Sequence, residues 1–121
     1  MDAWKVVLVV EDDTDGQALR LLAGRSGLGC HLDWVPANGL GNIKRRGIRL
    51  IQLAQARIRK GQGCVAVLVD RDGHDSTSQE PYATIRRHCR EARVPYLEAG
   101  GAGVQWITDS VPRDAGLSYS V

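Results

Sequence analysis

Short apolar runs alternate with longer amphipathic stretches along the chain. Residues 5–10 (KVVLVV) and 64–69 (CVAVLV) are apolar at nearly every position, which is typical of parallel strands that helices cover on both faces. Residues 30–35 and 94–97 are less regular apolar runs and predict two more strands. Because these strands alternate with helical patterns, the chain is predicted to have the βαβ arrangement of α/β proteins.

Three segments have apolar residues at helical spacing, over about 13–24, 42–60 and 82–93. Asp13 or Thr14 is suited to cap the first of them. The expected buried positions of the first helix are Ala18, Leu19, Leu21 and Leu22. Those of the second helix are Ile43, Leu50, Ile51, Ala54 and Ile58. The predicted fold class is therefore α/β, a single-domain three-layer βαβ fold with a mainly parallel four-stranded sheet of the Rossmann-like kind.

The regular pattern ends near Glu98. Residues 1–98 are predicted to form the α/β domain, and residues 99–121 a C-terminal extension for which the pattern predicts no particular structure. Within the extension, Val104, Trp106 and Ile107 are suited to packing at the edge of the sheet. The end of the chain is expected to be loosely held.

The composition is that of a globular protein. The chain has 121 residues, enough for one domain, and 43% hydrophobic against 25% charged residues fits neither a disordered nor a collagen-like chain. Three widely spaced cysteines without a CxxC pair argue against a disulfide framework or a zinc site, so a reducing, cytoplasmic setting is expected. Neither a signal peptide nor a membrane-spanning stretch is recognisable, so no membrane partner is expected.

Acidic residues follow both of the most hydrophobic strands. Glu11 comes directly after the first strand, Asp70 directly after the third, and Asp72 soon afterwards. In an open parallel sheet, ligands bind at the carboxyl ends of the strands. These side chains are therefore expected to lie together with Asp15 and Asp75 at this edge of the sheet, which we call the rim. Clustered carboxylates repel one another, and a cation bound by oxygen ligands alone is typically Mg²⁺ or Mn²⁺. Glu11, Asp70 and Asp72 are the predicted metal ligands, and Asp15, Asp75 and His74 are additional candidates.

A purely structural explanation stays open for part of this acidic cluster. Acids in the first turn of a helix often only stabilise the helix by interacting with its dipole. For Asp12, Asp13 and Asp75 the sequence favours this role and the metal-binding role equally. A single histidine in a loop, such as His74, is commonly just solvated. Glu11 and Asp70 differ because they directly follow apolar runs, where an unpaired acid is hard to explain by structure alone.

Basic residues gather in two helical segments, although the net charge of +2 is by itself too small to imply nucleic acid. The first set comprises Lys44, Arg45, Arg46, Arg49, Arg57, Arg59 and Lys60, and the second Arg86, Arg87, Arg90 and Arg93. These residues either hold a phosphodiester backbone or solvate exposed helix faces. The strongest candidates for phosphate binding are Gly39, Gly41, Lys44, Arg45 and Arg46, since exposed amides at a helix N-terminus also attract phosphate.

Two motifs resemble those of Toprim domains. Residues 9–15 (VVEDDTD) resemble the first Toprim motif, in which a Glu ends the first strand and is followed by a turn and an acid. Residues 69–75 (VDRDGHD) resemble the Asp-x-Asp motif, and the order and separation of the motifs also fit. The turn at 38–41 (NGLG) is similar to the glycine-containing turn of OLD-type nucleases and small bacterial Toprim-like proteins. The resemblance covers about residues 5–98.

The resemblance implies a function. Asp70 and Asp72 would bind Mg²⁺, and Glu11 would act as the general acid/base in cleavage of a nucleic acid strand or in nucleotidyl transfer. The chain departs from the family at Asp12, where Toprim domains usually have Gly, which puts the geometry of this turn in question. Toprim proteins usually carry further domains that position the nucleic acid. A partner protein chain, a homo-oligomer, or a lost or regulatory activity therefore stays open, as does whether the chain is an enzyme.

Two alternatives come from other classes. The first residues also resemble response-regulator receiver domains, in which Glu11, Asp12 and Asp13 would form the Mg²⁺ pocket and Asp70 would accept the phosphoryl group. Against this, the separation of Asp13 from Asp70 is longer than such domains normally have. In addition, the chain has no Lys anywhere after Arg71, although a receiver needs one after its last strands. A non-catalytic domain that binds nucleic acid or protein is the third possibility.

Overall fold

The computed structural model describes residues 4–25, 30–59, 61–70, 81–100 and 103–106 of the chain. In chain order the elements are β1 (Lys5–Val10), α1 (Asp13–Arg25), β2 (His31–Pro36), α2 (Leu40–Gln55), β3 (Gly63–Asp70), α3 (Tyr82–Ala92), β4 (Tyr96–Gly100) and β5 (Gly103–Trp106). The predicted alternation of strands and helices is confirmed.

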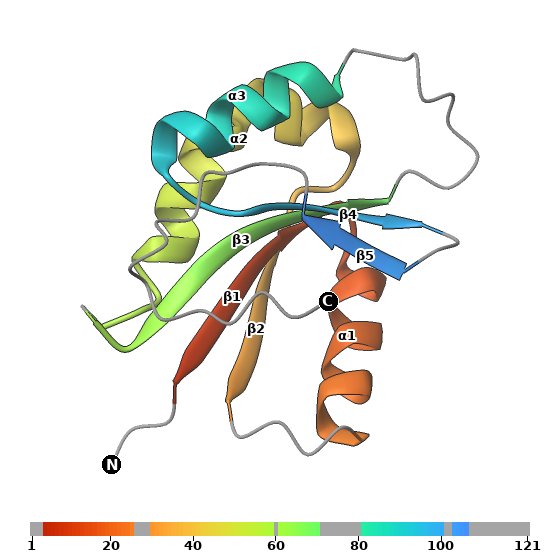
Figure 1. The fold of residues 1–121 in the computed structure, drawn as a ribbon, viewed down its shortest axis with the longest axis vertical. Coiled ribbons are helices and arrows are strands. Elements are labelled where there is room, and N and C mark those ends of the chain that lie inside the picture. The colour runs from red at the N-terminus through yellow and green to blue at the C-terminus, as the bar shows by residue number, and fades with distance from the viewer. Residues whose placement is uncertain (1–3, 26–29, 60, 71–80, 101–102, 107–121) are drawn as a thin grey trace.

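The strands form one sheet in the order β2-β1-β3-β4-β5. The first four are parallel to one another, and β5 pairs antiparallel with β4 at one edge. In Figure 1, α2 and α3 lie on one face of the sheet and α1 on the other, which gives three layers. The predicted fold class, a three-layer α/β fold with a mainly parallel sheet, is therefore confirmed.

The side chains of β1 and β3 alternate between two hydrophobic cores. Val7 and Val9 belong to the core that α2 and α3 cover, together with Ile51 and Ile85. The side chains that point to the other face of these strands belong to the core on the α1 side, and they are Leu8, Val10, Ala66 and Leu68. Because both faces of these strands are buried, every position in them favours an apolar residue, which explains the continuous apolar runs in the sequence.

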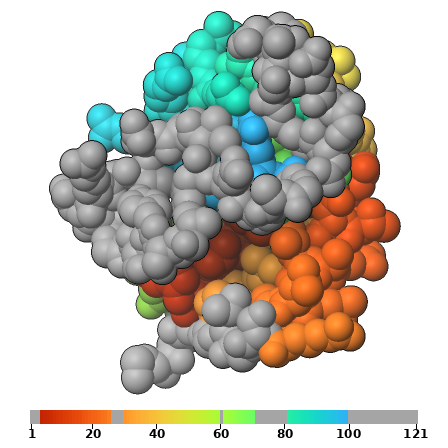
Figure 2. All heavy atoms as spheres, turned by 45° about the vertical axis from the view of Figure 1, so that its right-hand side comes forward, coloured from red at the N-terminus to blue at the C-terminus, as the bar shows by residue number. Residues whose placement is uncertain are grey.

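The outer side of α1 differs from the prediction. Leu21 and Leu22 are 66% and 60% exposed, and of the four residues expected to be buried only Leu19 packs on the core. Figure 2 shows α1, in orange, open on this side of the molecule. The helix packs instead through Gly16, where a Cβ atom would overlap the Trp34 ring. A broad indole thus occupies the contact that the leucines were expected to make.

The second helix is shorter than the pattern predicts. α2 ends at Gln55, and tight turns carry the chain on to Ile58, whose side chain still packs on the core. The helix is bent near Arg46, whose backbone is not helical. The next residue, Gly47, lies against His88 of α3, so a Cβ atom there would stand 2.8 Å from the imidazole. Close packing of α2 on α3 accounts for a glycine inside this helix.

The expected domain boundary after residue 98 falls inside β4, and β5 extends the same sheet. Residues 99, 100 and 103–106 therefore belong to the sheet, whereas Ile107 and the residues after it lie outside the described part of the chain. Among the helices that the structure describes, none is long and apolar enough to cross a membrane.

A candidate metal centre at the carboxyl ends of β1 and β3

Glu11 and Asp70 lie side by side at one end of the sheet. They stand at the carboxyl ends of β1 and β3, which are adjacent parallel strands. The Asp70 backbone N–H donates a hydrogen bond of 3.1 Å to Oε1 of Glu11. The strand order changes direction between β1 and β3, and this switch point is where open α/β sheets bind ligands. The two predicted residues are thus together at the position that the fold favours for a site.

The Glu11 carboxyl lies in an unusual environment. Burial raises its pKa above the ordinary value of 4.5, and the negative charges of Asp15, Asp70 and Asp12 raise the pKa further. The hydrogen bond from the Asp70 N–H acts in the opposite direction, because it favours the charged form. A partly buried carboxyl among like charges is suited to hold a proton or a cation.

This environment predicts a pH-dependent effect of Glu11→Gln on stability. The folded protein binds a proton at Glu11 more tightly than the unfolded chain does, so stability falls as the pH rises from 4.5 through the folded-state pKa. Glutamine removes the charge and keeps an oxygen to accept the Asp70 N–H. Near neutral pH we expect the variant to melt about 2 to 4 °C higher than the parent protein. Thermal melts followed by circular dichroism over a pH series measure the difference.

Glu91→Gln is the control for this comparison, since it removes a carboxylate from an exposed position on α3. The gap between parent and Glu11→Gln is expected to close toward pH 4.5, and near neutral pH Glu91→Gln should melt as the parent does. A melting temperature of Glu11→Gln below that of the parent near neutral pH would show that the buried charge of Glu11 does not destabilise the protein.

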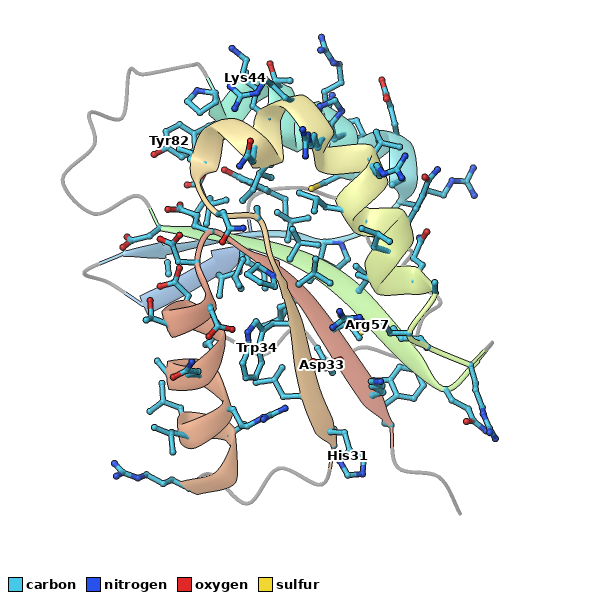
Figure 3. All side chains as sticks on the ribbon, turned by 180° about the vertical axis from the view of Figure 1, so that it is seen from behind. His31, Asp33, Trp34, Lys44, Arg57 and Tyr82 are labelled. Carbon is cyan, nitrogen blue, oxygen red and sulfur yellow. The ribbon has the colours of Figure 1, made fainter. Side chains whose placement is uncertain are left out.

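The other acids after β1 have local roles. Oδ2 of Asp15 accepts a 3.2 Å hydrogen bond from the Asp12 N–H and so caps the start of α1. Oδ1 of Asp13 accepts a 2.8 Å hydrogen bond from the indole of Trp34, which fastens α1 to β2. Figure 3 shows the Trp34 ring between these two elements. The structural interpretation thus suits Asp13, while Asp15 both caps α1 and lies close enough to Glu11 to influence its charge.

A hollow of about 230 Å³ adjoins the Asp70 carboxylate on the α1 side of the sheet. Asp15 and Asp70 line it together with apolar side chains that include Leu19 and Leu68. The sequence predicted the acids at this rim and did not predict the apolar wall beside them. That wall comes from the inward side of α1 and from β3, whose orientation only the fold determines.

The donor atoms at this rim suit a hard cation. Glu11 and Asp70 offer carboxylate oxygens, the ligands that Mg²⁺ and Mn²⁺ prefer. Asp72, His74 and Asp75 lie outside the described residues. Within the part of the chain that the structure describes, no three His, Cys, Asp or Glu side chains are arranged to hold a metal ion. Among the described residues, Glu11 and Asp70 are the acids that end the two central strands, and a metal centre there stays a prediction.

The predicted glycine turn lies directly against this rim. The Gly39 N–H donates a 2.9 Å hydrogen bond to the carbonyl of Glu11, so the turn before α2 is fastened to the end of β1. Gly39 has a φ of 119°, a conformation open to glycine and costly for other residues. Asn42 braces the turn, since its side-chain amide donates to the carbonyls of Ala37 and Asn38.

The basic residues of α2 extend away from this turn. The Arg45 guanidinium donates a 2.9 Å hydrogen bond to Oδ1 of Asn42 and lies over Gly41 in the first turn of the helix. Arg46 is exposed at the bend of α2. The Lys44 carbonyl is 2.9 Å from Nε2 of His88, and Figure 3 shows Lys44 on α2 at the opposite end of the molecule from His31. The turn before α2 thus contacts the end of β1, and the basic residues follow it in the first turns of the helix.

The second basic cluster, on α3, is divided. Arg86 forms a 2.9 Å ion pair with Glu98 of β4 and lies over the Tyr96 ring. Arg87 and Arg90 are exposed. Arg86 therefore joins α3 to the sheet, and the exposed arginines face solvent.

Comparison with family models, curated proteins and solved structures finds no match for this chain. The Toprim resemblance therefore stays a prediction, and the functional argument rests on the geometry of the rim.

Proposed function

We propose that this chain carries out metal-dependent phosphodiester chemistry on nucleic acid, either strand cleavage or nucleotidyl transfer. The observation that supports this most is the contact between Asp70 and Glu11 at the switch point of the sheet, with Asp15 beside them. A partly buried acid next to an exposed one provides two carboxylates in different environments. That difference allows one to exchange protons while the other binds a cation.

The roles follow from these environments. Asp70 is exposed and is the first candidate to hold Mg²⁺ or Mn²⁺, with Asp72 as a further ligand from the sequence pattern. When bound, such a cation polarises the reacting phosphate and stabilises the charge that develops on it. Glu11 is partly buried and burial raises its pKa, which suits a general acid/base.

The start of α2 is suited to hold the phosphodiester. Gly39 lies against the end of β1, and Gly41 with Lys44, Arg45 and Arg46 follows in the first turns of the helix. A helix N-terminus presents backbone N–H groups, and this one has no acid in its first turn. The backbone of a nucleic acid held there would place a phosphate near Glu11 and Asp70.

Incubation of the purified protein with labelled single-stranded and duplex DNA and RNA tests this function. Cleavage or nucleotide addition that requires Mg²⁺ or Mn²⁺ and stops with EDTA is expected. Light scattering on the same sample shows whether activity belongs to a monomer, a homo-oligomer or a complex with a partner. Absence of both reactions with every substrate and both metals would contradict the proposal.

A receiver domain is the second candidate, since the order β2-β1-β3-β4-β5 is also that of flavodoxin-like folds. Against it, β5 is antiparallel to β4 and follows it after a very short connection, whereas a parallel strand needs a crossover. Incubation with acetyl phosphate separates the two. Phosphorylation of Asp70 would favour the receiver.

A further inference from the structure

A second polar site lies at the opposite end of the sheet, beside the starts of β1 and β2. It is a hollow of about 590 Å³ with four cationic side chains in its lining. These are Lys5, Arg20, Arg57 and Arg59, and among the residues that the structure describes the lining also includes His31 and one acid, Asp33. β1 has six residues, so at about 3.3 Å per residue this hollow is about 20 Å from Glu11. It is therefore distinct from the carboxylate rim.

Asp33 forms ion pairs with two of these cations. Oδ2 of Asp33 lies 3.1 Å from the Arg57 guanidinium and 3.9 Å from Nζ of Lys5. Arg57 also donates to the Trp34 carbonyl, and Lys5 donates to the carbonyl of Arg57. Figure 3 shows Asp33 and Arg57 on the same side of β2, away from Trp34. The cations are thus held in place before any ligand arrives, which reduces the entropy cost of binding.

The free edge of β2 is covered by side chains at this site. Arg20 lies 4.5 Å from the centre of the Trp34 ring, with its guanidinium 3.5 Å from the Leu32 carbonyl. The backbone N–H of Trp34 donates to the side chain of Asp33, and the backbone carbonyl of Trp34 accepts a hydrogen bond from Arg57. Since these backbone groups are engaged, the edge is poorly suited to pair with another strand. The hollow presents charge rather than a strand edge.

The hollow continues around the edge of the sheet. A second hollow of about 280 Å³ shares Arg20, His31 and Leu32 with it and reaches Gly24 near the end of α1. Trp4, whose carbonyl accepts the His31 N–H, is 42% exposed at the same end of the sheet. An elongated groove lined by cationic side chains is typical of proteins that bind the backbone of a nucleic acid strand.

We propose that this groove binds phosphate groups, carried either by a nucleic acid strand or by a small phosphorylated molecule such as a nucleotide. Arginine guanidinium groups match the geometry of phosphate oxygens, and among the described lining residues four are cationic and one is acidic. The proposal does not depend on the chemistry at Glu11 and Asp70. It holds even if those carboxylates catalyse nothing.

Binding of a labelled single-stranded oligonucleotide, followed by fluorescence anisotropy in EDTA, tests the groove without any cleavage. The double variant Arg20→Glu/Arg59→Glu changes two exposed positions and leaves the Asp33 pairings intact. We expect it to bind at least about tenfold more weakly and to show a smaller salt dependence, by about 0.7 in slope for each phosphate that it no longer neutralises. Arg87→Glu/Arg90→Glu makes the same change of charge on α3 and is expected to stay within about threefold of the parent.

Calorimetric titrations with pyrophosphate and with a mononucleotide identify the source of the phosphate. If only the oligonucleotide binds, and the groove variant loses this binding, the ligand is a nucleic acid. If pyrophosphate or the mononucleotide also binds, and the groove variant loses that binding, the ligand is a small phosphorylated molecule. Circular dichroism checks the fold, and Arg20→Gln/Arg59→Gln replaces the double variant if that one unfolds. The proposal is overturned if neither probe binds, or if the groove and α3 variants weaken binding equally. Because binding is measured in EDTA without cleavage, a failure of the groove is distinguishable from a failure of the metal-dependent cleavage assay.

Discussion

Replacement of Asp70 by Asn is expected to lower the rate of metal-dependent cleavage by about a hundredfold or more. The side chain of Asp70 is exposed at the end of β3 and offers a carboxylate to a cation, which Asn replaces with a neutral amide. Loss of an anionic ligand weakens both the binding of the cation and its ability to stabilise charge on the phosphate. Contributions of this kind amount to several kcal/mol, and each factor of ten in rate corresponds to about 1.4 kcal/mol. Single-turnover cleavage assays at saturating Mg²⁺ measure the effect.

The fold of Asp70→Asn should be unchanged, because the hydrogen bond to Glu11 comes from the backbone N–H of Asp70. Asp12→Asn is the matched control. It removes an exposed carboxylate near Glu11 that no proposed role requires, and its rate should change by less than about threefold. Equal losses in both variants would mean that the general negative potential of the rim matters, and that Asp70 has no special role.

Gly63→Ala is expected to destabilise the protein by about 3 kcal/mol or more, and so to lower its melting temperature by about 10 °C. Gly63 begins β3 beside β1, and a Cβ atom at this position would overlap the backbone carbonyl of Lys5. Backbone cannot swing aside as a side chain can, so the two central strands would have to separate locally. Urea unfolding followed by circular dichroism gives the free energy of unfolding.

Gly24→Ala provides the comparison for this variant. Gly24 lies in α1, and a Cβ atom there would meet nothing within 4 Å. Alanine has the higher helix propensity, so the variant should be as stable as the parent or more stable, by up to about 1 kcal/mol. If Gly63→Ala were as stable as Gly24→Ala, the close approach of β1 and β3 in the structure would be wrong.

The central strands were the most predictable part of the fold. The run at 5–10 coincides with β1, and the run at 64–69 lies within β3, because burial on both faces leaves little freedom in the choice of residue. The inward side of α1 was not predictable in the same way. Its contact with the sheet depends on Gly16 and Trp34, which are far apart in sequence, and a hydrophobic pattern cannot show that a glycine is the point of contact.

The candidate sites differ in the same respect. Glu11 and Asp70 were recognisable because each directly follows an apolar run, and parallel strands bring such ends together. The hydrogen bond between them and the apolar wall beside Asp70 needed the structure. The basic groove had only a partial signal in the sequence. Arg57 and Arg59 belong to the first basic set, whereas Lys5 and Arg20 come from β1 and α1 and meet them only at the edge of β2.

Titration of the protein with Mn²⁺, followed by the electron paramagnetic resonance signal of the free ion, tests most directly whether Glu11 and Asp70 form a metal centre. The parent protein is expected to bind Mn²⁺ and to release it on addition of excess Mg²⁺. Asp70→Asn and Glu11→Gln should each weaken binding by about tenfold or more, while Glu91→Gln on α3 should bind as the parent does. Equal Mn²⁺ affinity in the parent and in Asp70→Asn, or no binding by the parent, would contradict the proposed metal centre.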